Sequence, residues 1–366
     1  MTGPVRDTAA VVGIGMTTLS RKSGCSVLEL AVQAAELALE DAGLAAADVD
    51  AVLSYHMNDS APVPYVARSL GIGRLGWHNE IYGGGTQAAS ILGDAAMLIS
   101  SGQARRVLIF RALNGRSGKR MSQVPLRVGA GAEEQFTLPY GMLGPVHLFA
   151  LAAQRWLSDR GLGPDALGHV VVSSRARAAD NPRAVLRKPM TLEEHAASPM
   201  VASPLRRADC CLETDGAAAV IVAPARDFPD APRLRAVVRG GGSGSSTMDK
   251  ADDVSRVFSA HLAPSLYQAA GMTPRDIDVA MLYDAYSYLV LAQLEDFGFC
   301  GRGEVPALLG PGAPVVNPNG GLLSEGYVHG LNNVVEAIRQ LRAGATVALV
   351  TGFGGSYGSA AILVRG

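Results

Sequence analysis

The feature that most constrains the fold of this chain is an internal repeat. The segments "LEDAGLAAADVDAVLSYH" (39–56) and "LYQAAGMTPRDIDVAMLYDA" (266–285) share a helix end, a glycine, an acidic turn and an apolar strand. Read in one register, the matched positions are Gly43 and Gly271, Asp48 and Asp276, Asp50 and Asp278, and Tyr55 and Tyr283. Each copy predicts a helix closed by a C-terminal glycine, followed by a short loop and a buried strand. The chain is therefore expected to consist of two similar halves.

The segments around the repeat extend this symmetry. Each half opens with a strand-like run, "AAVVGIG" in the first and "LRAVVRGGG" in the second, and later has a glycine cluster, a helix and a buried strand. Strands that alternate with helices predict largely parallel sheets covered by helices. The Pro-rich "PARDFPDAP" divides the chain into an N-terminal half, 1–228, and a C-terminal half, 229–366.

Residues 113–200 break the pattern of alternating strands and helices. They carry many Arg and Pro residues, and we expect them to form an excursion that lies over the mouth of an active site. Within this excursion, "GPVHLFALAAQRWLSDRG" (144–161) has the apolar spacing of an amphipathic helix. The excursion is therefore expected to be ordered rather than a disordered insert.

The composition excludes several classes of function. The net charge of −1 gives no general attraction for nucleic acid or an anionic membrane. Charged residues make up only 18%, which suits a thoroughly buried α/β protein that hides further surface in an oligomer. The four cysteines form no C-x-x-C pair, so we expect no disulfide framework and no metal site within the chain. The start of the chain lacks the order of charged and apolar residues found in signal peptides, and the cytoplasm is the expected location.

One uncharged run, "ATVALVTGFGGSYGSAAILV" (345–364), has the length of a membrane span. Its glycine-rich centre is unsuited to a helix, and its flanks are short and rich in β-branched residues. The run therefore predicts a hairpin of two buried strands rather than a span.

Three glycine clusters are candidates for ligand binding: "YGGGT" (82–86), "NPNGGLLSEGY" (317–327) and "GFGGSYG" (352–358). Glycines before a helix let the backbone approach a ligand and present unpaired N–H groups to an anion. Taken alone, such clusters equally mark turns or tight packing. The candidate backbone positions are Gly84, Gly85, Gly320, Gly321, Gly354 and Gly355.

The order and context of these clusters give the chain its resemblance to the thiolase superfamily. "NPNGG…EGYVHG" resembles that family's Asn-x-Asn-Gly-Gly…Gly-His-Pro segment, and "GFGGSYG" resembles its Cys-x-Gly-Gly-Gly-x-Gly loop. "LYDAYS", "YGGGTQAAS" and "DCCLETDGAAAVIVA" resemble three further family segments. The resemblance implies the thiolase fold, an αβαβα sandwich in which each half supplies a mixed five-stranded sheet.

The departures from the family motifs bear on the chemistry. Tyr82 stands at the position of the nucleophilic cysteine, and Gly352 stands at that of the base cysteine. The two oxyanion positions, usually Asn and His, are Tyr283 and Tyr327. Thiolysis needs a thiolate nucleophile, and none of the four cysteines matches either catalytic position, so that mechanism is not expected.

A narrower resemblance comes from "YDAYSYLVLAQLEDFGFCGRGE" together with "GGLLSEGYVHG". These segments are similar to the lipid-transfer or sterol-carrier-type thiolase-like proteins, a group that includes steroid side-chain aldolases. The resemblance implies retro-aldol cleavage of a 3-hydroxyacyl-CoA, carrying a steroid, sterol or bile-acid side chain, to a ketone or aldehyde and a short acyl-CoA. It implies Tyr283 and Tyr327 as the catalytic residues, and no cofactor beyond the CoA of the substrate. It also implies a homodimer that works with a small separate protein, an OB-fold domain preceded by a zinc ribbon.

The roles of the two tyrosines follow from their expected positions. Tyr327 is expected at the start of a helix, where the positive helix end favours an ionised base for the 3-hydroxyl. Tyr283, at a strand end, is then the donor to the enolate. His329 lies two residues from Tyr327 and would point away from it on a helix, so we expect a supporting or packing role.

Other polar residues have two open interpretations each. Asp284 and Glu325 either orient the tyrosines or cap turns, and Tyr82 and Tyr357 are possible supporting groups. The arginines of 111–120 and 173–189 either bind CoA phosphates or lie in solvated loops. Two alternative functions also stay open: a non-catalytic acyl-CoA-binding or scaffold subunit, and an acyltransferase with another nucleophile.

Overall fold

The computed structural model describes residues 5–118, 120, 138–142, 144–241, 256–304, 315–353 and 357–366. Two of its strands, β11 (Val347–Phe353) and β12 (Tyr357–Val364), pair antiparallel. The predicted hairpin is therefore confirmed. Within the described ranges, no helix combines the length and hydrophobicity needed to cross a membrane.

Strands from the two halves form one ten-stranded mixed sheet. The strand order in this sheet is β10-β9-β11-β12-β8-β1-β7-β4-β2-β3. The strands of the N-terminal half are β1 (Ala9–Met16), β2 (Ala51–His56), β3 (Trp77–Tyr82), β4 (Val107–Asn114) and β7 (Asp215–Pro224). Those of the C-terminal half, besides β11 and β12, are β8 (Arg233–Gly241), β9 (Val279–Met281) and β10 (Val315–Val316). The two groups meet where Ala10 of β1 pairs with Arg233 of β8. Each half thus supplies five strands in the same relative order.

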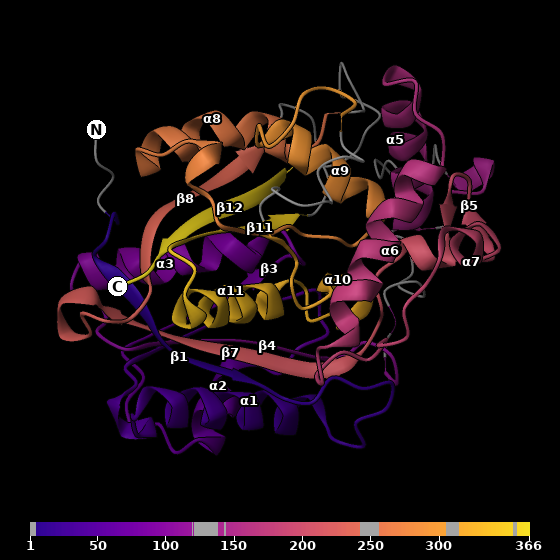
Figure 1. Ribbon diagram of the computed structural model, residues 1–366. Coiled ribbons are helices and arrows are strands. Elements are labelled where there is room, and N and C mark those ends of the chain that lie inside the picture. Colours follow the sequence, from indigo (N-terminus) through magenta and orange to yellow (C-terminus); the bar gives the residue numbers. More distant parts are fainter. Residues whose placement is uncertain are drawn as a thin grey trace.

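Helices lie outside each group of five strands and between the two groups (Figure 1). The outer helices beside the N-terminal strands are α1 (Val27–Ala42) and α2 (Val63–Ser69). The central pair is α3 (Gln87–Ser100) and α11 (Leu331–Ala343), and the outer helices beside the C-terminal strands are α8 (Phe258–Ala270) and α9 (Ser287–Asp296). Short 3-10 turns are η1 (Ala46–Asp48), η3 (Leu138–Tyr140), η4 (Arg207–Asp209), η5 (Ala225–Asp227) and η7 (Pro274–Asp276). The predicted αβαβα thiolase fold is confirmed.

The internal repeat is visible in individual hydrogen bonds. Gly43 and Gly271 close α1 and α8 in the left-handed conformation, with φ of 63° and 64°. Asp50 accepts hydrogen bonds from the backbone N–H groups at 105 and 106, and Asp278 accepts them from those at 346 and 347. Each aspartate therefore ties the start of one strand to the start of its parallel neighbour.

In its described residues the excursion of 113–200 includes α-helices, and a small hairpin begins at its end. These elements are α5 (Pro145–Asp159), α6 (Asp165–Ala179), α7 (Leu192–Ala196), β5 (Met200–Ala202) and β6 (Leu205–Arg206). The helix predicted at 144–161 is thus confirmed, while residues 119, 121–137 and 143 lie outside the described residues. α6 packs against α9 and the short α10 (Gly321–Ser324), and the Ser174 hydroxyl donates to the carbonyl of Gly320 at 2.6 Å. The excursion therefore rests directly on the predicted glycine turn.

Candidate active site

Two tyrosine hydroxyls meet in the interior near the end of the C-terminal sheet. The hydroxyl oxygens of Tyr283 and Tyr327 lie 2.7 Å apart, and the rings are nearly perpendicular at a centroid distance of 6.3 Å. Tyr283 is 2% exposed and Tyr327 is 8% exposed. The structure thus brings together the two residues predicted to be catalytic.

Tyr283 is held by its backbone just after β9. Its N–H donates to Oγ1 of Thr351 at 2.8 Å, and the Thr351 hydroxyl donates to Oε1 of Gln293 at 2.6 Å. The amide of Gln293 in turn donates to the carbonyl of Tyr283 at 2.9 Å. This closed ring of hydrogen bonds joins β11 and α9 to the tyrosine, so its hydroxyl has little freedom to move.

Tyr327 lies in an extended turn and not at a helix start. α11 begins at Leu331, and positive φ angles at Gly326 (146°), His329 (47°) and Gly330 (86°) keep the intervening backbone out of a helix. Both backbone groups of Tyr327 bind the side chain of Thr214, whose Oγ1 accepts at 3.0 Å and donates at 3.1 Å. The prediction that a helix end favours an ionised Tyr327 is therefore wrong.

Burial sets the protonation state of the pair. Removal from water raises the pKa of Tyr283 and of Tyr327 well above the ordinary tyrosine value. Both hydroxyls are therefore neutral near pH 7, and each can donate one proton while it accepts another.

His329 faces the tyrosines, against expectation. Its ring lies edge-on to the ring of Tyr327 at a centroid distance of 4.9 Å. The prediction that His329 points away assumed a helix, whereas its φ of 47° turns the side chain back. Burial, reinforced by the charge of Arg111, lowers the pKa of His329 to about 3, so the ring is neutral.

The two candidate carboxylates serve the glycine turn and do not orient the tyrosines. Asp284 accepts from the N–H groups of Leu322 and Leu323 at 2.9 and 3.3 Å, which is the capping alternative. Burial raises the pKa of Asp284 to about 7. Glu325 is fully buried and accepts from the side-chain amides of Asn181, Asn319 and Asn332 at 3.0, 2.6 and 3.4 Å.

The glycines divide into two groups. The N–H of Gly320 donates to the carbonyl of Asn317 at 2.9 Å, and that of Gly321 donates to Oδ1 of Asn319 at 3.0 Å. These two N–H groups are already occupied, so the prediction that they hold an oxyanion is wrong. Gly354 and Gly355 lie outside the described residues.

Gly84 and Gly85 remain candidates for contact with a ligand. Among the described residues, no acceptor faces their N–H groups. A Cβ on Gly85 would overlap the hydroxyl of Tyr283, and one on Gly84 would lie 3.7 Å from Cε1 of His329. The start of α3 therefore approaches the tyrosine site with bare backbone.

Tyr82 and Tyr357 lie on the surface, outside the buried pair. Tyr82 ends β3, is 54% exposed and packs edge-on to His56. Tyr357 begins β12 and is 40% exposed. Their supporting role stays a prediction.

A family model described as thiolase C-terminal domain-like matches residues 240–366. The chain is 38% identical over 365 residues, 94% of each protein, to the 17-hydroxy-3-oxo-4-pregnene-20-carboxyl-CoA lyase of Mycobacterium tuberculosis. The chain belongs to the thiolase superfamily.

Further relatives of this superfamily member agree with the narrower resemblance. The steroid side-chain-cleaving aldolase of Thermomonospora curvata is 36% identical, with 91% of this chain and 90% of that protein covered. A solved structure of an Ltp2-ChsH2(DUF35) aldolase superposes with a TM-score of 0.92 at 34% identity, and 99% of each chain is covered. The resemblance to the steroid side-chain aldolases is confirmed.

Sequence reasoning missed Asp59 and Cys211 of this thiolase-superfamily site, and both of its alternatives for Arg111 are wrong. Arg111 is fully buried in β4 and binds both Asp59 and His329, so it neither binds a phosphate nor lies in a solvated loop. A charged residue inside the apolar run "RRVLIFRAL" was the available signal, because a buried arginine needs a buried partner. Cys211 packs against the core cluster that contains both tyrosines, and burial raises its pKa well above that of a free thiol. This thiol is therefore not an activated nucleophile.

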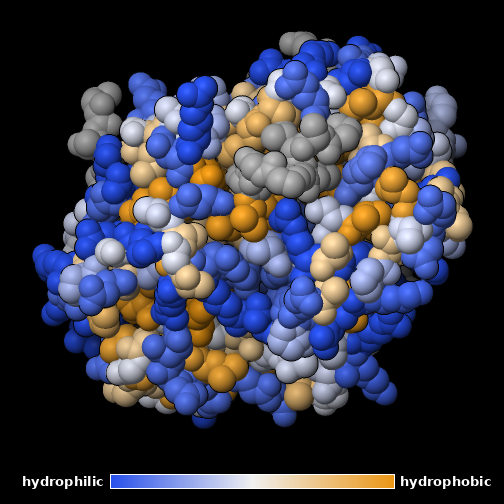
Figure 2. Space-filling view, viewed as in Figure 1, coloured by the Kyte–Doolittle hydropathy of each residue, from blue (hydrophilic) through white to orange (hydrophobic). Residues whose placement is uncertain are grey.

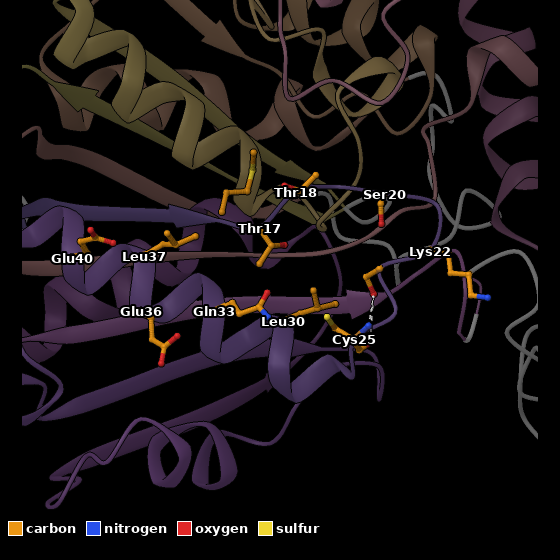
Figure 3. Close-up of a pocket in the computed structure, with 12 residues that line it drawn as sticks. Thr17, Thr18, Ser20, Lys22, Cys25, Leu30, Gln33, Glu36, Leu37 and Glu40 are labelled. Carbon is orange, nitrogen blue, oxygen red and sulfur yellow. Dashed lines mark hydrogen bonds between the residues drawn. The ribbon is translucent and has the colours of Figure 1, made fainter.

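A separate cleft of about 660 Å³ lies on the outer side of the N-terminal half, between α1 and the segment after β1 (Figure 3). Residues from both walls line it, among them Thr17, Lys22, Gln33 and Glu36. None of its lining residues belongs to the tyrosine site. The cleft is therefore separate from the tyrosine site.

Proposed function

We propose that this protein is a carbon–carbon lyase that cleaves a 3-hydroxyacyl-CoA by a retro-aldol reaction. The observation that carries the proposal is the buried pair of neutral hydroxyls of Tyr283 and Tyr327, 2.7 Å apart. Support comes from relatives named as a pregnene-carboxyl-CoA lyase and a steroid side-chain-cleaving aldolase. The substrate class we infer is therefore a CoA thioester with a steroid or similar side chain.

The proposed reaction moves one proton and one electron pair. The 3-hydroxyl loses its proton, its oxygen becomes a carbonyl, and the bond between the second and third acyl carbons breaks. The electron pair forms an enolate on the thioester, and a proton then returns to the second carbon. Because there is no acyl-enzyme and no net oxidation, the reaction needs neither a cysteine nucleophile nor a cofactor beyond the CoA of the substrate.

The hydrogen bond between the tyrosines suits this proton transfer. One neutral hydroxyl can accept the proton of the substrate while it passes its own proton to the second hydroxyl, so a free phenolate need not accumulate. Tyr327 is the more exposed of the two and is therefore assigned to the 3-hydroxyl, with Tyr283 as donor towards the enolate. General acid–base groups of this kind contribute about 10²- to 10⁴-fold to a rate.

The test uses a steroid 3-hydroxyacyl-CoA, with the protein alone and with a candidate DUF35 partner. Mass spectrometry should detect a ketone or aldehyde and a short acyl-CoA such as propionyl- or acetyl-CoA. Tyr327→Phe should lower kcat by about 10³-fold. Tyr267→Phe is the matched control, because that hydroxyl donates only to the carbonyl of Phe297 in another part of the half. Unchanged cleavage by Tyr327→Phe, or the absence of cleavage in the wild type with its partner, would refute the proposal.

The homodimer of the proposal is supported by the edge strand β3. Among the described strands, β3 pairs with β2 alone and ends the sheet order, and it exposes 43% of Trp77 and 54% of Tyr82. An exposed edge strand is a template for pairing with a second chain. Light scattering should give twice the mass of one chain, and a Trp77→Lys variant should shift the mass towards that of a monomer. A monomeric wild type would contradict the homodimer.

A second partner, a small OB-fold and zinc-ribbon protein, is supported by the DUF35 component named in the similar solved structure. The excursion offers it hydrophobic side chains that lie among hydrophilic ones at the right of the molecule, over the region of α5, α7 and β5 (Figures 1 and 2). The exposed side chains there include Leu151, Leu192, Met200 and Val201. A Leu151→Glu, Met200→Glu variant should lose the partner on gel filtration while its dimer mass stays the same. Full retention of the partner would exclude this surface.

The location that we propose for the protein is the cytoplasm, since all four cysteines are free.

A further inference from the structure

A polar cluster next to Tyr327 consists of the partly buried Asp59 and the fully buried Arg111 and His329. Nη2 of Arg111 donates to both carboxylate oxygens of Asp59 at 2.7 Å. The same guanidinium lies against Nδ1 of His329, at 3.2 Å from Nε and 2.7 Å from Nη2. The side chains of Arg111 and His329 are both fully buried.

These contacts decide which nitrogen of His329 carries the proton. Arginine is a donor only, so Nδ1 must accept with its lone pair. A neutral imidazole then has its proton on Nε2. The guanidinium of Arg111 therefore keeps His329 in the tautomer with the proton on Nε2. Asp59 neutralises and orients this guanidinium.

The Nε2–H group has no partner of its own. Among the described residues it is a buried polar atom without a hydrogen bond. An unpaired buried donor costs about 1–3 kcal/mol, so its presence needs a reason. The backbone of His329 is also strained, with φ of 47°, and it is fixed by the Tyr55 hydroxyl, which donates to its carbonyl at 2.9 Å. Strain and an unpaired donor at one residue are typical of a ligand-binding position.

The unpaired donor borders the same small region as the tyrosine hydroxyls. Cε1, the ring carbon between Nδ1 and Nε2, would lie 3.7 Å from a Cβ on Gly84, whereas a Cβ on Gly85 would overlap the hydroxyl of Tyr283. Successive Cα atoms are about 3.8 Å apart. The edge of the His329 ring and the hydroxyl of Tyr283 therefore approach adjacent residues of one backbone segment, Gly84 and Gly85. On its other side the His329 ring contacts Tyr327.

We propose that His329 is a third catalytic residue, which donates Nε2–H to the thioester oxygen as the enolate charge develops. Arg111 and Asp59 are positioning residues that keep the proton on Nε2. A neutral N–H stabilises this charge without giving up its proton, so the electron pair stays available for protonation at the second carbon. The inference rests on the proposed retro-aldol function and adds a donor to the same site.

The kinetic test replaces His329 with asparagine. Asparagine tolerates positive φ, and its Oδ1 can accept from Arg111 as Nδ1 does, but it lacks a group at the position of Nε2–H. We expect His329→Asn to lower kcat by about 10²-fold, as for the loss of one oxyanion donor, while KM and the melting temperature stay near wild type. A kcat of wild-type size in a folded His329→Asn protein would overturn the inference. The proposed function would still stand, since Tyr327→Phe tests it separately.

A second readout needs no substrate. In 15N-labelled full-length protein, the ring resonances that disappear in His329→Asn belong to His329. They should show one tautomer at pH 7, with the proton on Nε2, and Arg111→Met should abolish that single tautomer. A proton on Nδ1 in the wild type, or a mixture of tautomers, would overturn the assignment whatever the activity of the protein.

Discussion

Tyr55 and Tyr283 occupy the same place in the two copies of the repeat, yet they meet different partners. Both stand at the end of a parallel strand and both are buried. The hydroxyl of Tyr55 donates to the backbone carbonyl of His329, whereas the hydroxyl of Tyr283 faces the hydroxyl of Tyr327. A carbonyl has no proton to pass on, while a hydroxyl does. The partner of a hydroxyl, and not its place in the fold, therefore decides whether it can transfer a proton.

The strands next to these tyrosines differ in the same sense. The register of β2 with β4 and of β9 with β11 matches Phe110 to Thr351 and Arg111 to Gly352. In the N-terminal half, Arg111 reaches across to hold the ring of His329. In the C-terminal half, Thr351 holds the backbone of Tyr283, and Gly352 leaves room for the start of α3, because a Cβ there would lie 2.5 Å from the carbonyl oxygen of Gly85. The N-terminal half therefore positions His329 through Arg111, whereas the C-terminal half supplies the two tyrosines of the site.

The difference between the two copies of the repeat is tested most directly by removing the tyrosine hydroxyl from each copy. Tyr283→Phe should lower kcat by about 10³-fold, because the relay loses a proton-bearing group. Tyr55→Phe should keep kcat within about tenfold and lower the free energy of unfolding by about 1 kcal/mol, the contribution of one hydrogen bond. Steady-state kinetics and urea unfolding measure both. Equal losses of activity in the two variants would show that the copies are not functionally distinct.

The ion pair that the N-terminal half places behind His329 should contribute to the free energy of unfolding. Asp59→Ala leaves the fully buried guanidinium of Arg111 without its carboxylate. The loss of one partner of a buried ion pair lowers the free energy of unfolding by about 3–5 kcal/mol. Lys188→Ala is the control, because its ion pair with Glu194 is exposed and contributes about 0–1 kcal/mol. Chemical denaturation that shows similar small losses for the two variants would contradict the role given to Asp59.

Much of the fold and part of the site could be predicted from the sequence. The repeat predicted the two similar halves, and the motif resemblance identified Tyr283 and Tyr327, whose hydroxyls the structure brings to 2.7 Å. The turn that holds Tyr327 and His329 was wrongly predicted as a helix start. Glycines at 326 and 330 are compatible with both conformations, and contacts with residues distant in the sequence, Thr214, Tyr55 and Arg111, help to select the extended turn.

The missing parts of the site share one cause, which is distance along the chain. Arg111 and His329 are separated by 218 residues, and Asp59 belongs to a third segment. No local spacing connects these three residues. A buried charge in an apolar strand indicates that a partner exists, but it does not identify the residue that is the partner.

Asp284 and His56 occupy matched positions after the two tyrosines, and only the aspartate is fully buried, which predicts a difference in pH dependence. Burial raises the pKa of Asp284 to about 7, so the stability linked to its neutral form is present at low pH and is lost as the pH rises through 7. Relative to Asp284→Asn, the wild type should lose roughly 2 kcal/mol of unfolding free energy between pH 5 and pH 7. Other buried carboxylates, such as Glu325, titrate in both proteins and cancel in the difference. A pH-independent difference between the two proteins would exclude this titration.

The smallest expected effect tests where the two copies remain equivalent. Asp50 and Asp278 each accept two backbone N–H groups from the start of the neighbouring strand, at residues 105 and 106 or 346 and 347. Neither is part of the tyrosine site, so replacement by alanine should lower the free energy of unfolding by about 1–2 kcal/mol in each half and leave kcat unchanged. Guanidinium unfolding of Asp50→Ala and Asp278→Ala, measured side by side, gives the comparison. A loss several-fold larger at Asp278, accompanied by lower activity, would show that strand registry in the C-terminal half is coupled to the placement of Tyr283, and that even this shared device has diverged.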